Sequence, residues 1–310
     1  MAKMTLNLPA NFYKEEIRND YVITSNMKKV WAVELDLFKQ LDSICKKHNI
    51  TYYADGGTLL GAIRHHGFIP WDDDMDFIMY RKDFEQLCKF SSEFKEPYFF
   101  QTEETDPGSL RCHAQLRNTS TTGILKSEME YNYLFNQGIF IDIFPLDNVP
   151  QDLHERVDFV RKMKSLKLKA RKYYNYNNGL ERKIRITGVH TLLKNLKRPL
   201  FSFYYKNLNK KYKKTNPFYD KYIKEVVKYN KTNTKYVMDI AVGTENDLLC
   251  KDDIHSQIYI PFEMFEIPVP NNYSKVLESY YGNWHKMVRG KNAHGGCLFD
   301  VDKSYKEYLK

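Results

Sequence analysis

One short acidic stretch limits what this chain can fold into more than any other feature. The residues are Asp72-Asp73-Asp74-Met75-Asp76, and they lead directly into the apolar run Phe77-Ile78-Met79. The second half of this stretch predicts a buried strand, in which residues two apart point to the same face. Asp74 and Asp76 can then hold one hard cation between them, with Asp72 just upstream within reach of the same ion.

A solvated loop is the ordinary interpretation of an acidic run, but the residues on both sides favour burial here. Ile69, Pro70 and Trp71 precede the acids, and the apolar strand follows them. A strand buried on one face also fixes which side chains point to the other face. We therefore predict a metal site rather than a solvated loop.

A further acid, Asp142, interrupts the apolar run Gly138-Ile139-Phe140-Ile141-Asp142-Ile143-Phe144. Burying a carboxylate without a partner is costly, so a metal or a catalytic role would account for it. This run predicts a further strand of the sheet, which can carry Asp142 to the same site.

A glycine turn precedes the acids. A short strand over residues 51–54 stops at Gly56-Gly57, and Thr58 can cap the helical turn that continues to Arg64. A strand, a glycine turn and a helix start outline a site for an anion, so Gly56, Gly57 and Thr58 are candidate residues for binding the donor phosphates. Arg64 can neutralise charge on a leaving phosphate. The plain alternatives are an ordinary tight turn and a surface arginine.

The remaining pattern predicts an α/β (α+β) fold, a mixed sheet flanked by helices with an inserted helical region. Residues 27–48 have apolar side chains at helical spacing and should pack on the sheet without contributing chemistry. The other elements that we expect are a helix over 81–94, strands over 98–102, 113–117, 138–144, 257–260 and 264–269, and a helix over 273–281, with Pro145 ending the third strand.

The 310 residues suggest two compact parts. Residues 1–150 form the predicted catalytic core, 151–235 a basic helical insertion, and 236–310 a part that completes the catalytic domain. Within the insertion, residues 161–185 carry ten Lys and Arg against the single acid Glu181. Its surface is expected to face the acceptor or a membrane.

Composition limits the partners and the compartment. The net charge of +9 favours an anionic partner, and five scattered cysteines without a C-x-x-C pair fit a reducing cytosol better than a disulfide framework. No apolar run reaches the length of a membrane span, and the first residues lack the apolar core of a signal peptide. We expect a cytoplasmic protein, with peripheral contact to the inner face of the plasma membrane left open.

Two blocks of the chain resemble the LicD family of phosphocholine transferases, and fukutin-related ribitol-phosphate transferases share the pattern. The first block runs from Tyr53-Ala54-Asp55-Gly56-Gly57-Thr58-Leu59-Leu60-Gly61-Ala62-Ile63-Arg64 to Gly67-Phe68-Ile69-Pro70-Trp71-Asp72-Asp73-Asp74-Met75-Asp76. The second is Gly138-Ile139-Phe140-Ile141-Asp142-Ile143-Phe144-Pro145-Leu146-Asp147. The resemblance implies a nucleotidyltransferase-like fold and transfer of a phospho-alcohol from a CDP-linked donor to a sugar hydroxyl, with release of CMP.

The resemblance also implies roles for single residues. Asp72, Asp74, Asp76 and Asp142 would ligate a divalent metal, Mg²⁺ or else Mn²⁺, or act on the acceptor. Arg117 lies in a matching Leu-Arg strand and is a candidate contact for the donor phosphates, with a rim salt bridge as the alternative.

Three further features stand outside the carboxylates of these two blocks. Tyr281-Gly282-Asn283-Trp284 resembles a C-terminal family element, although the proline pair that often follows is absent. His294, before two glycines, is a candidate site residue with a structural role as the alternative. Trp71 is the best candidate for an aromatic contact with a choline head group, since a quaternary ammonium favours aromatic faces, with plain core packing as the alternative.

The predicted function is metal-dependent transfer of phosphocholine, or a related phospho-alcohol, from CDP-choline or a similar donor to a glycan. The acceptor would be a cell-surface glycan such as teichoic acid or lipopolysaccharide, or a lipid-linked precursor. The helix near residues 186–201, with apolar residues beside lysines and an arginine, is typical of a helix that lies on a membrane surface, with a solvated basic face as the alternative. No nucleic-acid partner is expected.

Two alternatives stay open. The same carboxylates suit nucleotidyl transfer from a nucleoside triphosphate, with release of pyrophosphate in place of CMP. A non-enzymatic protein that binds anionic surfaces or nucleic acid would explain the charge and the tyrosines, but it would not explain a buried Asp142.

Overall fold

The fold is built around one long strand, β8 (Ile139–Asn148), in a computed structural model of the chain. The described residues are 2–180, 189–212, 215–290 and 296–309, and of residues 189–195 only the backbone is described. One edge of β8 pairs in parallel with β4 (Asp76–Tyr80). The other edge pairs antiparallel, first with β6 (Ala114–Asn118) and then with β9 (Tyr236–Asp239).

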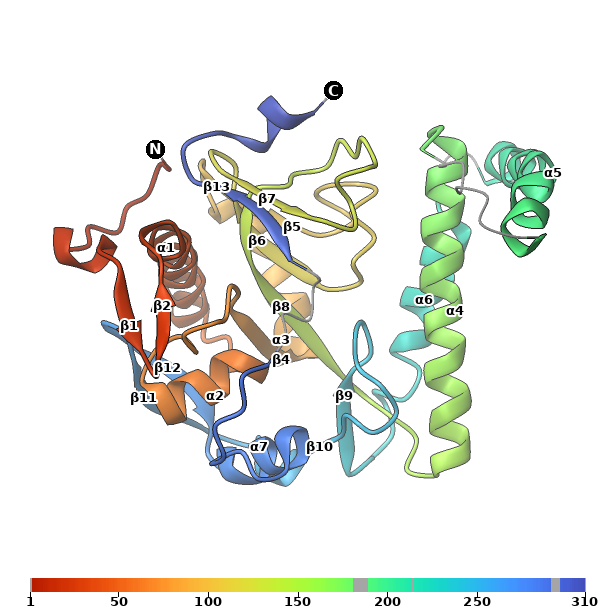
Figure 1. Cartoon of the computed structure of the whole chain (residues 1–310). Helices are drawn as coiled ribbons and strands as arrows, with labels where there is room; N and C mark the ends of the chain where they lie inside the picture. The colour runs from red at the N-terminus through yellow and green to blue at the C-terminus, as the bar shows by residue number, and fades with distance from the viewer. Residues whose placement is uncertain (1, 181–188, 213–214, 291–295, 310) are drawn as a thin grey trace.

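The remaining strands extend this sheet on both sides. The order is β10 (Leu249–Cys250), β9, β8, β4 and β3 (Tyr53–Ala54), while β5 (Tyr98–Gln101) pairs with β6. Among the described residues these seven strands form a mixed sheet, and helices cover it (Figure 1). The mixed α/β fold predicted from the sequence is therefore confirmed.

Pro145 does not end its strand, contrary to the prediction. β8 continues through Pro145 to Asn148, and Pro145 itself pairs with Met79 of β4. On the other edge the last β6 pair is at Ile143 and the first β9 pair is at Leu146. The proline therefore sits where one neighbouring strand gives way to the next, and there its missing N–H costs the ladder least.

The helix α1 (Ser25–His48) packs its apolar face against the sheet. The Thr24 side chain accepts a hydrogen bond from the Met27 amide at its start, and Asn49 ends the helix in the left-handed conformation. Phe38 of this helix stacks on Phe77 of β4, with ring centroids 5.6 Å apart. The predicted helix over 27–48 is confirmed.

The next helix, α3 (Arg81–Lys89), is shorter than the predicted range 81–94. Phe90 leaves the α-helical conformation and stacks on His48 at the end of α1, and the chain continues as a 3₁₀ turn, Ser91–Glu93. Packing against α1 therefore ends the helix before its apolar pattern does.

Short elements complete the core. The strand pairs are β1 (Glu16–Arg18) with β2 (Tyr21–Ile23), β7 (Thr122–Leu125) with β13 (Cys297–Asp300), and β11 (Gln257–Phe262) with β12 (Phe265–Pro270). The other short elements are α7 (Tyr273–Tyr281) and the 3₁₀ turns Ala10–Tyr13, Lys251–Asp253 and Tyr305–Tyr308. The predicted strands near 257–260 and 264–269 and the helix over 273–281 are all present.

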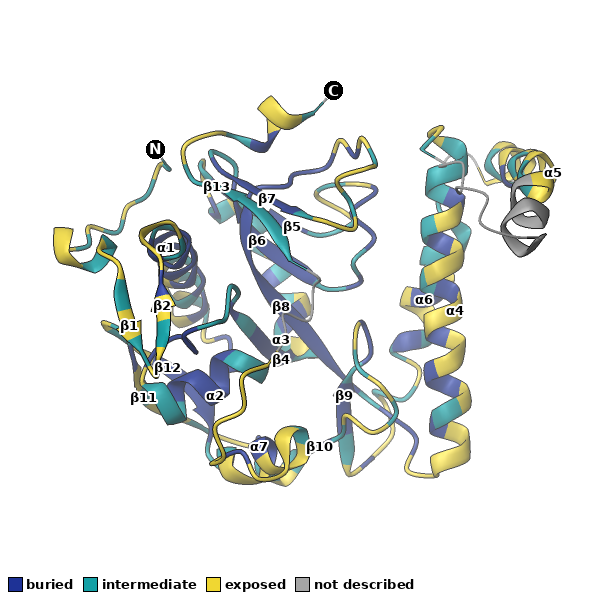
Figure 2. Cartoon of the chain, in the orientation of Figure 1, coloured by how far each residue is buried: buried dark blue, intermediate teal, exposed yellow. Residues whose placement is uncertain are grey.

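Three helices occupy the stretch predicted as a helical insertion: α4 (Leu153–Asn177), α5 (Val189–Lys211) and α6 (Pro217–Val226). In Figure 1 they stand beside β9, with α5 farthest from the sheet. Figure 2 shows β8 as buried, whereas much of α4 and the described part of α5 are exposed. None of the helices in the described ranges is both long and apolar enough to cross a membrane.

Candidate active site

Two of the predicted carboxylates meet through the sheet itself. Asp76 of β4 and Asp142 of β8 are directly paired on neighbouring parallel strands. Asp72 and Asp74 lie in the loop just before β4, so the predicted strand begins at Asp76 and not at Asp74. We call Asp72, Asp74, Asp76 and Asp142 the acidic cluster.

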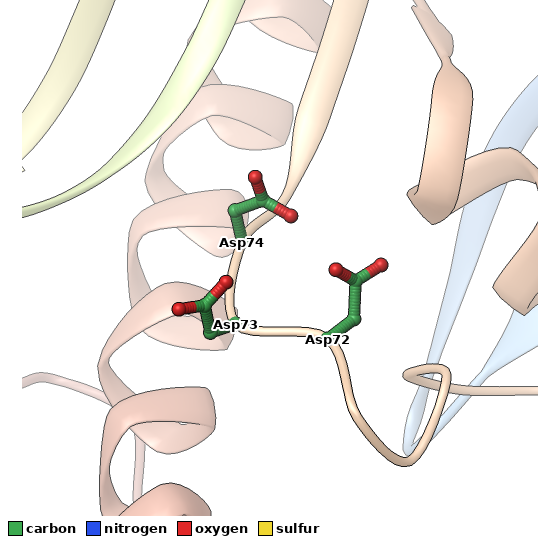
Figure 3. Close-up of side chains that lie close together, drawn as sticks. All are labelled: Asp72, Asp73 and Asp74. Carbon is green, nitrogen blue, oxygen red and sulfur yellow. The ribbon is translucent and has the colours of Figure 1, made fainter. Parts of the chain in front are cut away.

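The loop before β4 gathers carboxylates closely. One carboxylate oxygen from each of Asp72, Asp73 and Asp74 lies within 4.8 Å of the others. In Figure 3 the carboxylates of Asp72 and Asp74 extend to the same side of the loop, while Asp73 points away from Asp72. Oxygen ligands at this spacing suit a hard divalent cation such as Mg²⁺.

Two neighbouring helices hold this loop in place. Trp31 of α1 donates its indole N–H to the Asp72 carbonyl at 3.1 Å. The sequence predicted only a packing role for α1, but the helix also positions a residue of the site. The Thr58 hydroxyl accepts a hydrogen bond from the Asp76 amide at 2.8 Å. Thr58 is buried and absent from the cavity lining, so the prediction that it binds the donor does not fit its position. Asp55, three residues earlier, is the N-cap position of the helix.

The glycine turn packs directly on the acidic cluster. It opens α2 (Gly56–His65), which follows β3 after Asp55, and Gly56 has φ +51°. A β-carbon on Gly57 would lie 2.4 Å from Asp72 Oδ2, so only glycine fits beside that carboxylate. The positive end of α2 therefore faces an acidic side chain, which is a favourable placement.

A cavity of about 950 Å³ contains the whole acidic cluster. Gly56, Gly57, Arg64 and Trp71 also line it, as the sequence predicted. Its wall also includes the following residues that the sequence analysis did not single out as site residues: Asp55, Arg111, His113, Gln115, Lys167, Arg171, Asp239, Tyr281 and Trp284. The cavity thus combines carboxylates, cations and aromatic rings.

Burial and mutual repulsion disfavour ionisation of the loop carboxylates. Burial, followed by the charges of Asp74 and Asp73, raises the pKa of Asp72 to about 8. Burial, Asp73 and Asp142 raise the pKa of Asp74 to about 7, and burial with the charges of Asp74 and Asp142 raises that of Asp76 well above its usual range. A divalent cation would relieve this repulsion, so the donor set fits one.

Asp142 differs from the other three because two side chains hydrogen-bond to it. Gln115 Nε2 donates to Asp142 Oδ1 at 2.7 Å, and His113 Nε2 lies 3.0 Å from the same oxygen. Burial acts against ionisation, but His113 and Gln115 outweigh it and hold the pKa of Asp142 below its ordinary value. Asp142 is therefore better suited to act as an anionic ligand than as a general base.

Arg64 and Arg117 have different surroundings. Arg64 lines the cavity, donating through Nη1 to the Trp284 carbonyl at 3.1 Å. Arg117 is 0% exposed and donates to Gln101 Oε1, the Gly138 carbonyl and Gln115 Oε1. The prediction that Arg117 contacts the donor does not fit this position, because its guanidinium is enclosed within the sheet and orients Gln115 instead.

His294, a candidate from the sequence, lies outside the residues that the structure describes. Other residues near the site could not be located from the sequence. Glu34 of α1 is buried behind the acidic loop, where burial and the charge of Asp74 raise its pKa well above the usual range. Tyr281 and Trp284 reach the cavity from the C-terminal element that resembles one of the family's. Lys167 and Arg171 carried no such signal, because they look like surface residues of a basic helix.

Comparison with known proteins agrees with this site. The family model described as LicD/FKTN/FKRP, nucleotidyltransferase domain, matches residues 49–179, which include the whole acidic cluster. The chain is similar to the lipopolysaccharide cholinephosphotransferase LicD of Haemophilus influenzae, with 28% identity over 273 residues. That alignment covers 84% of this chain and 92% of the relative.

Shorter matches lead to two proteins from Rickettsia. The uncharacterized proteins RP689 of Rickettsia prowazekii and RT0683 of Rickettsia typhi are each 40% identical over 60 residues, or 19% of this chain. The family model spans the acidic cluster, and the relative aligns over most of both chains. Residues 49–179 of the chain match the LicD family, and the similarity to the Haemophilus relative extends over most of the chain.

Proposed function

We propose that this protein transfers phosphocholine, or a related phospho-alcohol, from a CDP-linked donor to a sugar hydroxyl of a cell-surface glycan or its precursor, with release of CMP. The single observation that carries the proposal is that Asp72, Asp74, Asp76 and Asp142 meet in one cavity in a LicD-family chain. The cholinephosphotransferase activity in the name of the Haemophilus relative supports phosphocholine as the group transferred.

The acidic cluster would hold the divalent metal, with Mg²⁺ first and Mn²⁺ second. When bound, such an ion neutralises phosphate charge and orients the phosphate oxygens. Gln115 and His113 keep Asp142 ionised, and Trp31 and Thr58 fix the backbone that carries Asp72 and Asp76. The chain thus orients its carboxylates before any substrate arrives, which is the main source of acceleration in phosphoryl transfer.

The rest of the cavity suits the other parts of a CDP-choline donor. Trp71, Tyr281 and Trp284 line it, and aromatic faces stabilise a quaternary ammonium by roughly 0.5–2 kcal/mol each. Arg64 is held by the Trp284 carbonyl at the same wall, where it can neutralise charge on the CMP that leaves. We assign the choline head group to the Trp71, Tyr281 and Trp284 side of the cavity.

We further propose that α5 rests on an anionic membrane surface, where a lipid-linked acceptor would be found. Its described face exposes Leu196, Leu200 and Phe203, with exposed fractions of 64%, 71% and 70%. Lys197 and Arg198 lie between these residues in the sequence, and Lys210 and Lys211 follow. Apolar side chains beside cations are typical of interfacial helices.

The proposed compartment is the cytoplasm, at the inner face of the plasma membrane. All five cysteines are unpaired, as expected for a reducing environment. The anionic lipids of an inner leaflet would attract the basic α5.

The decisive experiment follows the nucleotide product. Purified protein would be incubated with CDP-choline, CDP-ribitol or CDP-glycerol, a glycan mixture, and Mg²⁺ or Mn²⁺, and CMP would be measured. We expect metal-dependent CMP release that Asp74→Asn abolishes and that Asp158→Asn, a change at an exposed acid of α4, leaves unchanged. Pyrophosphate from a nucleoside triphosphate, with no reaction of any CDP donor, would instead establish a nucleotidyltransferase.

A further inference from the structure

Three cations line the α4 side of the cavity. Lys167 and Arg171 are four residues apart on α4 and therefore share one face of that helix. Arg111 reaches the same cavity from the segment just before β6. We call Arg111, Lys167 and Arg171 the basic cluster.

The hydrogen bonds of the basic cluster orient two of its cations without neutralising them. Lys167 Nζ donates to the Ala241 carbonyl at 2.7 Å. Arg171 donates to the carbonyls of Gly108 and Ser109 at 3.1 and 2.5 Å. Carbonyl oxygens carry no net charge, so these bonds fix the direction of the side chains and leave their charges in place.

Carboxylates near the basic cluster offset its charge only in part. Arg111 Nη2 pairs with Glu128 at 2.7 Å, while Arg111 Nε is buried and has no partner in the part of the chain that is described. Within those same ranges, Lys167 and Arg171 have no salt bridge to an acid. Glu103 and Asp239 interact with them at longer range, and Glu103 is occupied by the amides of Gly108 and Leu110.

The three cations also repel one another. Burial first, and then the charges of Arg111 and Arg171, lower the pKa of Lys167, while Cys112 and Asp239 act in the opposite direction. Uncharged hydrogen-bond donors could attach α4 to its neighbours with a smaller loss of free energy, because desolvating several cations together is unfavourable. An anion bound among them would remove that cost.

We propose that the basic cluster is a phosphate-binding subsite, separate from the acidic cluster, that holds a phosphate group of a substrate. Guanidinium and ammonium groups form short, charge-assisted hydrogen bonds to phosphate oxygens, and two arginines with a lysine match its tetrahedral set of acceptors. The phosphate has two sources under the proposed function, on which this assignment to a substrate rests: the diphosphate of the CDP-linked donor and a phosphate carried by the acceptor glycan.

The first test needs no catalysis. Binding of inorganic phosphate and of CMP to the full chain would be measured by titration calorimetry in EDTA, which removes metal from the acidic cluster. Lys167→Gln and Arg171→Gln remove the charge and leave a polar side chain, and Lys169→Gln is the matched change at an exposed position of α4. We expect roughly tenfold weaker phosphate binding for each of the first two variants and none of this loss for Lys169→Gln.

The second test identifies the source. If the donor supplies the phosphate, Lys167→Gln and Arg171→Gln raise KM for the CDP-linked donor about tenfold; if the acceptor supplies it, KM for a phosphorylated acceptor rises instead. Equal phosphate binding by wild type and both variants, with native melting temperatures, would overturn the subsite. A wild-type chain that binds phosphate in EDTA but turns over no CDP donor would keep the subsite and refute the proposed function.

Discussion

The two charged sides of the cavity are built in opposite ways. The acidic cluster stands on the central strands β4 and β8 and the loop between α2 and β4, and Trp31 and Thr58 hydrogen-bond to the backbone that carries it. The basic cluster comes from a peripheral helix and an irregular segment, and carbonyl oxygens hold two of its members. Each side is repulsive on its own, and each would be complementary to one part of the proposed metal and phosphate-bearing substrate.

This contrast shows how the fold places groups with different tasks. Asp76 and Asp142, two of the proposed metal ligands, are placed by strand register, which leaves little freedom. The three cations proposed to bind the larger anion come from α4 and from the segment before β6. Changes to the acids should therefore abolish the reaction, whereas changes to the bases should weaken it.

The largest effect is expected from Asp76→Asn or Asp142→Asn, which remove a carboxylate from the acidic cluster. CMP release should fall about a thousandfold in kcat/KM, since charge stabilisation contributes more than any other effect to catalysis in such sites. The melting temperature of Asp76→Asn in EDTA should be unchanged or higher. Folding raises the pKa of Asp76, so at any pH above the ordinary pKa of an aspartate this carboxyl lowers the stability of the fold. Near-native turnover by either variant would remove that residue from the mechanism.

A steric change tests how tightly the acidic side is built. Gly57→Ala would bring a β-carbon to 2.4 Å from Asp72 Oδ2 and displace that carboxylate. Activity should fall about a hundredfold, as misplacement by about an ångström can do. Gly290→Ala, at a cavity residue whose added β-carbon would meet nothing within 4 Å, is the control and should retain activity.

Metal binding should stabilise the acidic side without any substrate. Adding saturating Mg²⁺ should raise the melting temperature by several degrees, because an ion bound only by the folded chain adds to its free energy of unfolding. The double variant Asp72→Asn/Asp74→Asn should lose this shift, while Lys167→Gln should keep it. A shift of equal size in the acidic double variant would place the ion elsewhere.

The smallest effect is expected from the exposed apolar side chains of α5. Leu200→Gln/Phe203→Gln removes two exposed apolar side chains and should weaken flotation with vesicles containing anionic lipid about tenfold. Turnover of a water-soluble acceptor should not change. Flotation that does not depend on anionic lipid in the wild type would show that α5 does not bind membranes through its charge.

The sequence predicted the acidic side well because its signals are local. Each of these signals can be recognised from a few neighbouring residues. They are the acids beside an apolar strand, the glycine turn, and the lone acid in an apolar run. Arg117 and Thr58 show the limit of such reasoning. Both residues lie in segments that border the site, but their side chains are buried. Only the folded sheet shows that Thr58 positions Asp76 and that Arg117 positions Gln115.

Periodicity and motif order were enough to predict the mixed α/β class, the similarity to the LicD family and the meeting of the four carboxylates, because these signals do not depend on knowledge of contacts. Packing in three dimensions set which distant residues share the cavity. Lys167 and Arg171 look like surface residues of a basic helix, and Tyr281 comes from the far end of the chain. Their meeting depends on how α4 and α7 pack beside the sheet, and long-range packing leaves no periodic trace in the chain.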